Sequence, residues 1–217
     1  MRKILLLAAC MIALTSLMAA QGASNGSKTG DLKTADLKTG DSKTAASKTL
    51  DKKIDNEFVH QQFGDQFTFL PEIGASFGDL DGDGVEDVVI AARCKNPMVD
   101  QGEHDYTVID PYDSFYGYGN PSITTTFSSG DPAQRGLALL IIHGAGTNAW
   151  RSPKPKAKFV IVNLPYRTLA VKKFKLKKTA IDAVYVEEAG DLGESSAVFF
   201  DAKHRQYRYV PMGGDME

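Results

Sequence analysis

Four aspartates crowd into one short stretch of this chain and run directly into apolar residues. In "SFGDLDGDGVEDVVIAA" (residues 76–92), Asp79, Asp81, Asp83 and Asp87 alternate with glycines before valine and isoleucine take over. Carboxylates at this density repel one another, so the chain must either place a cation among them or leave them in a very polar turn. The apolar run that follows predicts a buried strand. A strand–loop–strand unit built around a cation is therefore the first expectation.

The spacing of the carboxylates favours one shared ligand. With Asp79 as position 1, carboxylates fall at positions 1, 3, 5 and 9, and Gly82 and Gly84 at positions 4 and 6. Alternate side chains of a tight loop can converge, and glycine permits the turns with positive φ that bring them together. Val85 at position 7 can offer its carbonyl oxygen. Hard oxygens suit Ca²⁺, which takes about 6–8 of them, better than Mg²⁺, which needs a smaller and stricter octahedron.

The second half of the stretch excludes an EF-hand. Position 12 is Ile90, where an EF-hand needs a bidentate glutamate. The flanking sequence is strand-like, and no helix is expected before Asp79. The site is instead closed at position 9 by Asp87.

The same stretch resembles the FG-GAP (VCBS-like) repeat, whose copies form the blades of β-propellers such as those of integrin α chains. The resemblance covers residues 76–92 and implies that Ca²⁺ is bound by Asp79, Asp81, Asp83, Asp87 and the backbone of Val85. Residues 180–200 resemble a degenerate second copy, which lacks the aspartate cluster and keeps only Asp182 and Asp191. A full propeller needs several four-stranded blades. This chain has room for two or three at most, so an incomplete propeller and a sandwich both stay open.

The chain divides into three parts. Residues 1–23 are predicted to be a secretory signal, because a short basic start precedes a long apolar run and small residues. "LAAC" (residues 7–10) also matches a lipoprotein cleavage box, but the apolar run continues well past Cys10. Residues 24–54 repeat Lys-Thr with a period of five, and we expect a disordered linker there. Residues 55–217 are predicted to form a single β-rich domain with a calcium loop at 79–87.

Charge and cysteine content argue against a nucleic-acid-binding domain and against a domain stabilised by disulfides. The chain has 25 basic and 27 acidic residues, which is near neutral and argues against a nucleic-acid-binding domain. Once the signal is removed, Cys94 is the only cysteine, so no internal disulfide can form. We expect Cys94 to be a small buried residue. The expected location is the periplasm or the outside of the cell.

Short apolar runs bounded by glycine, proline or charge dominate the domain, and they predict a mainly β fold with antiparallel sheets. No convincing amphipathic helix is expected after the signal. "DAKHR" (residues 201–205) is predicted to be a hairpin turn. The expected strands lie within residues 86–93, 136–144, 158–165, 166–176, 180–188, 195–200 and 206–212.

Two segments are candidate surfaces for a protein or polysaccharide partner. Residues 105–135 are long, polar and rich in tyrosine, which suggests either a loop pinned to the sheet by its aromatic side chains or a recognition surface. Residues 151–178 hold ten basic residues and no acidic ones. They predict either a solvated face or a contact with an anionic envelope surface or polysaccharide.

A serine hydrolase of the α/β-hydrolase type is the alternative function. "HGAGTN" (residues 143–148) resembles an oxyanion-hole turn, with Ser195 of "GESSA" as the nucleophile and His204 as the base. A strand follows Ser195 where that fold requires a helix, and the crossover helices are not apparent. The preferred function is therefore an exported, non-catalytic calcium-binding β module with a binding or structural role at the cell envelope or outside the cell.

Overall fold

The computed structural model describes residues 53–118, 120, 129–176, 179–188 and 195–212. The predicted signal, all but the last two residues of the predicted linker, and Asp191 lie outside the described residues. Within the part described, no helix has the length and apolar character needed to cross a membrane. The account below concerns the unit formed by residues 49–217.

The fold is mainly β, as predicted, with 44% of the described residues in strands and 16% in helices. The sheets are open and do not close into a barrel. The strands are β1 (Phe67–Phe69), β2 (Ala75–Gly78), β3 (Asp87–Cys94), β4 (Thr107–Ile109), β5 (Leu137–His143), β6 (Ala157–Val162), β7 (Thr168–Leu176), β8 (Thr179–Glu187), β9 (Ser195–Asp201) and β10 (Gln206–Pro211). The helices are α1 (Asn56–Phe63), α2 (Gln101–His104), α3 (Pro111–Phe115) and the 3₁₀ helix η1 (Gly146–Arg151).

The first sheet has six strands in the order β1-β3-β5-β6-β4, and β2 also pairs with β3. Strands β1 and β2 share one edge of β3, because Phe67 pairs with Cys94 and Ala75 with Ile90. The loop between β2 and β3 carries the four aspartates. Strands β4 and β6 are parallel, whereas every other recorded pairing of the described strands is antiparallel.

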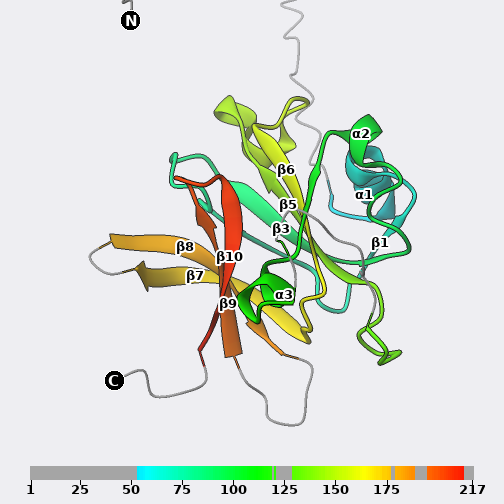
Figure 1. The fold of residues 1–217 in the computed structure, drawn as a ribbon. Coiled ribbons are helices and arrows are strands. Elements are labelled where there is room, and N and C mark those ends of the chain that lie inside the picture. The colour runs from blue at the N-terminus through cyan, green and yellow to red at the C-terminus, as the bar shows by residue number, and fades with distance from the viewer. Residues whose placement is uncertain (1–52, 119, 121–128, 177–178, 189–194, 213–217) are drawn as a thin grey trace, which may run out of the picture. The chain divides into compact units, whose positions relative to one another are not determined.

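Strands β3 and β5 are covered on both faces, which is why their sequences are almost continuously apolar. On one face, Val89, Leu139 and Ile141 pack against the second sheet. On the other, Ile90 and Leu140 belong to a separate cluster beneath α1. In Figure 1, α1 and the second sheet lie on opposite sides of these strands.

Helix α1 corrects the expectation of no amphipathic helix. Asp55 caps it by accepting a hydrogen bond from the backbone N–H of Phe58 (2.9 Å), and Gly64 ends it at φ 94°. Phe58, Val59 and Phe63 form its buried face. Burying side chains of this size contributes roughly 1.5–3 kcal/mol each. This contribution attaches the helix to the first sheet.

The second sheet has four antiparallel strands in the order β10-β9-β8-β7. The predicted hairpin turn is confirmed, since β9 ends at Asp201 and β10 begins at Gln206. Val184, Val198 and Tyr207 point into the core shared with the first sheet. A smaller cluster lies on the opposite face and contains Phe174, Ala183, Ala197 and Phe199.

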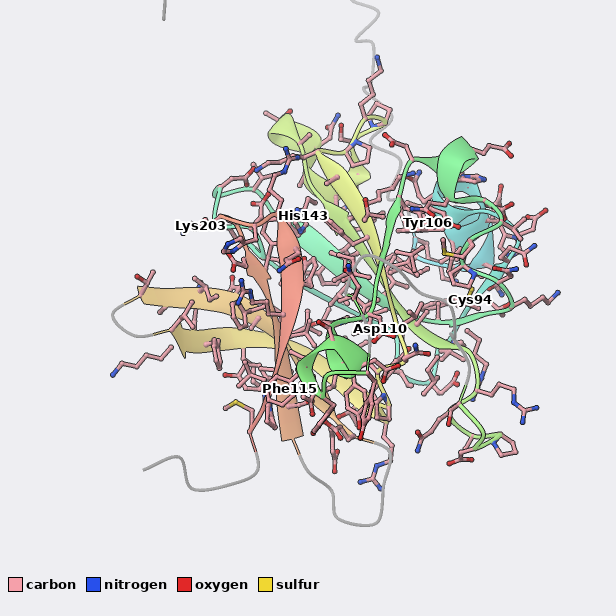
Figure 2. The ribbon with its side chains drawn as sticks, in the orientation of Figure 1. Cys94, Tyr106, Asp110, Phe115, His143 and Lys203 are labelled. Atoms are coloured by element: carbon pink, nitrogen blue, oxygen red, sulfur yellow. The ribbon has the colours of Figure 1, made fainter. Side chains whose placement is uncertain are left out.

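The tyrosine-rich segment forms regular structure in its first part, whereas residues 119 and 121–128 lie outside the described residues. It contains β4 and α3, and Tyr106 is buried against Phe63 and Phe67. Figure 2 places Tyr106 and Cys94 near α1 and Phe115 on α3. Cys94 is buried as expected, and burial raises the pKa of its thiol to about 12, so the thiol stays protonated and weakly nucleophilic.

Candidate metal centre

The aspartate loop folds around the Asp79 carboxylate. Oδ1 of Asp79 accepts hydrogen bonds from the backbone N–H groups of Gly82 (2.9 Å) and Asp83 (3.0 Å), and Oδ2 accepts one from Gly84 (2.9 Å). Gly82 and Gly84 have φ of 78° and 84°, which L-residues with side chains rarely adopt. The glycines therefore have the role that the sequence predicted, and the chain wraps tightly enough to bring its side chains together.

Three of the four predicted carboxylates converge. One oxygen from each of Asp79, Asp81 and Asp87 lies within 4.8 Å of the others. Asp83 lies at the rim of this group, where its Oδ1 accepts a hydrogen bond from the N–H of Val85 (2.9 Å). The roles of Asp83 and of the Val85 carbonyl as metal ligands stay predictions.

Asp87 is fully buried, with 0% of its surface exposed. Its Oδ2 accepts a hydrogen bond from the N–H of Leu80 (2.8 Å), and its Oδ1 accepts one from the N–H of Gly144 (2.7 Å). Burial raises the pKa of Asp87 to about 7, against the lowering effect of these two hydrogen bonds. Asp87 thereby fixes the loop to the end of β5.

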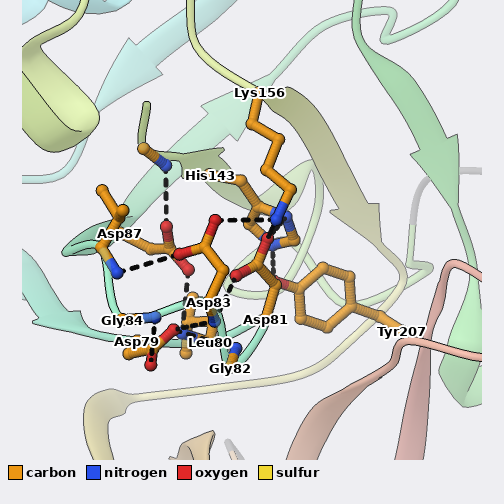
Figure 3. A network of polar contacts seen from close by, with 12 residues as sticks. Asp79, Leu80, Asp81, Gly82, Asp83, Gly84, Asp87, His143, Lys156 and Tyr207 are labelled. Carbon is orange, nitrogen blue, oxygen red and sulfur yellow. Dashed lines mark hydrogen bonds and ion pairs between the residues drawn. The ribbon is translucent and has the colours of Figure 1, made fainter. Parts of the chain in front are cut away.

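Lys156 supplies the nearest positive charge (Figure 3). Its Nζ lies 2.6 Å from Oδ2 of Asp81 and 2.7 Å from Oδ2 of Asp83. Hydrogen bonds to these two carboxylates raise the pKa of Lys156 well above its ordinary value. The hydrogen bond from Lys156 in turn lowers the pKa of Asp83. The lysine is therefore charged, and it neutralises part of the loop.

His143, at the end of β5, lies behind Asp81. Its Nδ1 is 3.4 Å from Oδ2 of Asp81, and its Nε2 is 2.7 Å from the hydroxyl of Tyr207 on β10. Burial lowers the pKa of His143 to about 4 and raises that of Tyr207 far above its usual range. The imidazole is therefore neutral and the phenol is protonated. A carboxylate can only accept, so the tautomer with its proton on Nδ1 suits the neighbouring Asp81, and in that tautomer Nε2 accepts from Tyr207.

The second sheet holds the loop at another point. Asp182 on β8 accepts a hydrogen bond from the backbone N–H of Asp79 (3.0 Å) and pairs with Lys173 (2.9 Å). Asp182 is one of the two aspartates of the predicted degenerate second copy. Here it accepts a hydrogen bond from the aspartate loop, and it is not one of the three converging carboxylates.

The only tryptophan of the chain lies beside the loop. The indole N–H of Trp150 donates to Oε1 of Glu86 (3.0 Å), and its backbone N–H donates to the Glu86 carbonyl (3.0 Å). Arg151 stacks on the indole ring at 4.2 Å. Ala149 has φ 52° and ψ −135°, a strained conformation for a residue with a side chain. A conformational change in the aspartate loop should therefore alter the surroundings of the Trp150 indole ring.

The residues of the hydrolase alternative do not come together. Ser195 begins β9, and the strand runs for about 20 Å to Asp201. His204 lies beyond it, in the turn between β9 and β10. His204 Nδ1 is 2.7 Å from Asp201 Oδ2. The N–H of Gly144, in the proposed oxyanion turn, already donates to Asp87. This geometry does not favour nucleophilic catalysis at Ser195.

Many residues of the basic segment have acidic or carbonyl partners within the protein. Besides Lys156 and Lys173, Lys158 donates to the Gln62 carbonyl (2.7 Å), and Arg167 lies 3.4 Å from Glu187. Lys177 and Lys178 lie outside the described residues. An anionic partner therefore meets fewer unpaired charges than the sequence suggested.

The tyrosine-rich segment forms an aromatic cluster around Tyr209. Tyr112, Phe115 and Tyr116 contact its ring with centroid distances of 5.1, 5.3 and 6.0 Å. Phe115 also borders a surface cavity of about 370 Å³, together with Phe199 and Val210. The expectation of aromatic side chains that pin the segment to the sheet agrees with these contacts.

Sequence reasoning missed the supporting residues of the loop. In the sequence, His143 belongs to the candidate oxyanion turn, and Lys156 is one of ten basic residues spread over residues 151–178. Tyr207 and Asp182 carried no local signal for this role. All four come from distant parts of the chain, so only the tertiary fold assembles them.

Comparison of the chain with protein-family models, with characterised proteins and with solved structures finds no match. The functional proposal therefore depends on the geometry of the loop and its surroundings.

Proposed function

We propose that this chain is an exported, non-catalytic β module of the FG-GAP type that binds one Ca²⁺ in the loop between β2 and β3. Asp79, Asp81 and Asp87 would hold the ion, with Asp83 and the Val85 carbonyl completing the set. Its role is binding or structural, at the cell envelope or outside the cell. The observation that carries the proposal is the convergence of three carboxylates on a loop that is already wrapped around Asp79.

The separations allow all three carboxylates to reach one calcium ion. Two oxygens on opposite sides of a Ca²⁺ ion with bonds of about 2.4 Å are about 4.8 Å apart. The three carboxylate oxygens all lie within 4.8 Å of one another. The donors are hard oxygens, and no imidazole or thiol replaces them, which favours Ca²⁺ over zinc.

The charge balance also favours a divalent ion. Asp79, Asp81, Asp83 and Asp87 face one ammonium group, that of Lys156. Even with Asp87 partly protonated near neutral pH, negative charge remains in excess within the loop. A bound Ca²⁺ would offset the repulsion among the carboxylates by coordinating their oxygens. Its role would be structural.

A calcium titration followed by Trp150 fluorescence tests the proposal. Because the indole donates to Glu86, next to Asp87, calcium should change the emission and reach saturation. Asp81→Asn removes one ligand charge and should weaken the apparent affinity by roughly tenfold or more. The matched control is Asp65→Asn, which removes the same charge from a side chain that is 89% exposed in the turn after α1.

The control should bind calcium as the unmodified chain does. Equal affinities for Asp81→Asn and Asp65→Asn would contradict the ligand assignment. The absence of any saturable calcium signal, by fluorescence and by calorimetry, would contradict the function itself.

A further inference from the structure

Lys156 is held so that its ammonium group enters the aspartate loop. Its backbone N–H donates to the carbonyl of His143 (2.9 Å), which fixes the start of the side chain beside the buried end of β5. From there Nζ reaches Asp81 and Asp83 at once (Figure 3). Among the described residues, it is the only lysine or arginine recorded within ion-pair distance of the four loop aspartates.

The two ends of this contact differ in exposure. The Asp81 side chain is 3% exposed, whereas that of Lys156 is 49% exposed. A buried carboxylate without a partner is costly, so Asp81 needs a cation when the loop holds no metal. The lysine, in contrast, can leave, because its flexible stem already lies half in solvent and its ammonium group hydrates strongly.

A lysine and a calcium ion cannot use the same carboxylates without cost. Asp81 belongs to the group of three converging carboxylates and also accepts the shorter of the two lysine contacts. A monovalent and a divalent cation about 5 Å apart repel by roughly 1–2 kcal/mol even in water, and by more in a less polar setting.

Resting on the proposed calcium site, we propose that Lys156 is a built-in counter-cation that stabilises the calcium-free loop and is displaced when Ca²⁺ binds. The lysine thereby lowers the calcium affinity of the loop. It also prevents the loop from unfolding when calcium is scarce. Lys156 therefore stabilises the calcium-free loop and disfavours the calcium-bound loop. An experiment can detect these two opposite effects.

Lys156→Met tests the proposal, because it removes the charge and keeps most of the stem. Calcium affinity measured by calorimetry at constant pH and low salt should rise by roughly tenfold. The midpoint of thermal unfolding in EGTA should fall by several degrees. Lys154→Met is the matched control, since Lys154 is an exposed lysine two residues away, and it should change neither quantity.

Amine labelling of the unmodified chain provides a test that does not depend on folding of the variant. Calcium should increase the labelling of Lys156 relative to that of Lys154, as mapped by mass spectrometry. If calcium binds but Lys156→Met binds it no more tightly than Lys154→Met, or if labelling of Lys156 does not change, the counter-cation role is wrong and the calcium site stands. If none of the proteins binds calcium, the proposed function itself fails.

Discussion

At the scale of single residues, Gly144 has no room for a side chain. Its N–H donates to Asp87, and a Cβ at this position would lie 2.4 Å from the Glu86 carbonyl oxygen and 2.8 Å from the Trp150 nitrogen. Both atoms belong to the backbone, so a flexible side chain cannot move away to make room. A methyl group would therefore force the end of β5 away from the aspartate loop.

Gly144→Ala should lower the free energy of unfolding by about 2–4 kcal/mol, because it combines overpacking with the loss of a buried hydrogen bond to Asp87. Urea unfolding measures the change. Gly102→Ala is the control, since Gly102 is helical and has no atom within 4 Å of the added Cβ. That substitution should be neutral or stabilising by up to about 1 kcal/mol. Equal losses for the two variants would contradict the close approach at Gly144.

The residues of the site were predictable only where the signal is local. The spacing of Asp79, Asp81 and Asp87 and the positions of the loop glycines are properties of one short stretch, and the loop has that form. Lys156 lies 73 residues away from Asp83 in the chain. Lys156, and not another of the ten basic residues, lies beside the loop because β6 pairs with β5. No local pattern in the sequence specifies this pairing.

At the scale of elements, α3 depends on one buried carboxylate. Asp110 caps the helix by accepting a hydrogen bond from the N–H of Asp113 (3.0 Å) and a second one from Asn163 Nδ2 (2.5 Å). Burial raises the pKa of Asp110 to about 6, although the hydrogen bond from Asn163 lowers it. The carboxylate therefore joins α3 to the turn after β6 at an electrostatic cost.

This cost predicts a pH dependence. The folded chain binds the Asp110 proton more tightly than the unfolded chain does. The contribution of this residue to stability is therefore fully present below about pH 4 and is lost as the pH rises through about 6. Asp110→Asn keeps an acceptor for Asp113 and removes the charge. Its stability relative to the unmodified chain should increase between pH 4 and pH 7 by on the order of 1 kcal/mol, after allowance for solvent screening. Urea unfolding across that range measures it, and a difference that stays constant with pH would contradict the assignment.

The elements themselves were predictable in proportion to their length and apolar content. The runs that became β3 and β5 carry a strong signal because they are apolar almost throughout. Helix α1 has only two turns, too few for a helical period to stand out, although Asp55 and Gly64 mark its ends. The parallel pairing of β4 with β6 is a long-range contact that local patterns do not encode.

At the scale of the whole β unit, the aspartate loop is a junction between the two sheets. The backbone N–H of Asp79 donates a hydrogen bond to Asp182 of β8. His143 lies between Asp81 and Tyr207 of β10 and contacts both side chains. A third connection lies nearby, where the N–H of Val171 donates to the Ser76 hydroxyl (2.9 Å). An ion bound in this loop would order the residues that join the sheets, so binding should stabilise the fold as a unit.

Thermal unfolding of the chain without its predicted signal, in millimolar Ca²⁺ and in EGTA with Mg²⁺ as a control, tests this claim most directly. At a calcium concentration about 100 times the dissociation constant, binding adds about 2.7 kcal/mol, which should raise the unfolding midpoint by roughly 5 °C or more. Mg²⁺ should not reproduce the shift, because it requires a smaller and stricter octahedron. Equal midpoints in Ca²⁺ and in EGTA would contradict the calcium site and leave the loop as a polar turn neutralised by Lys156.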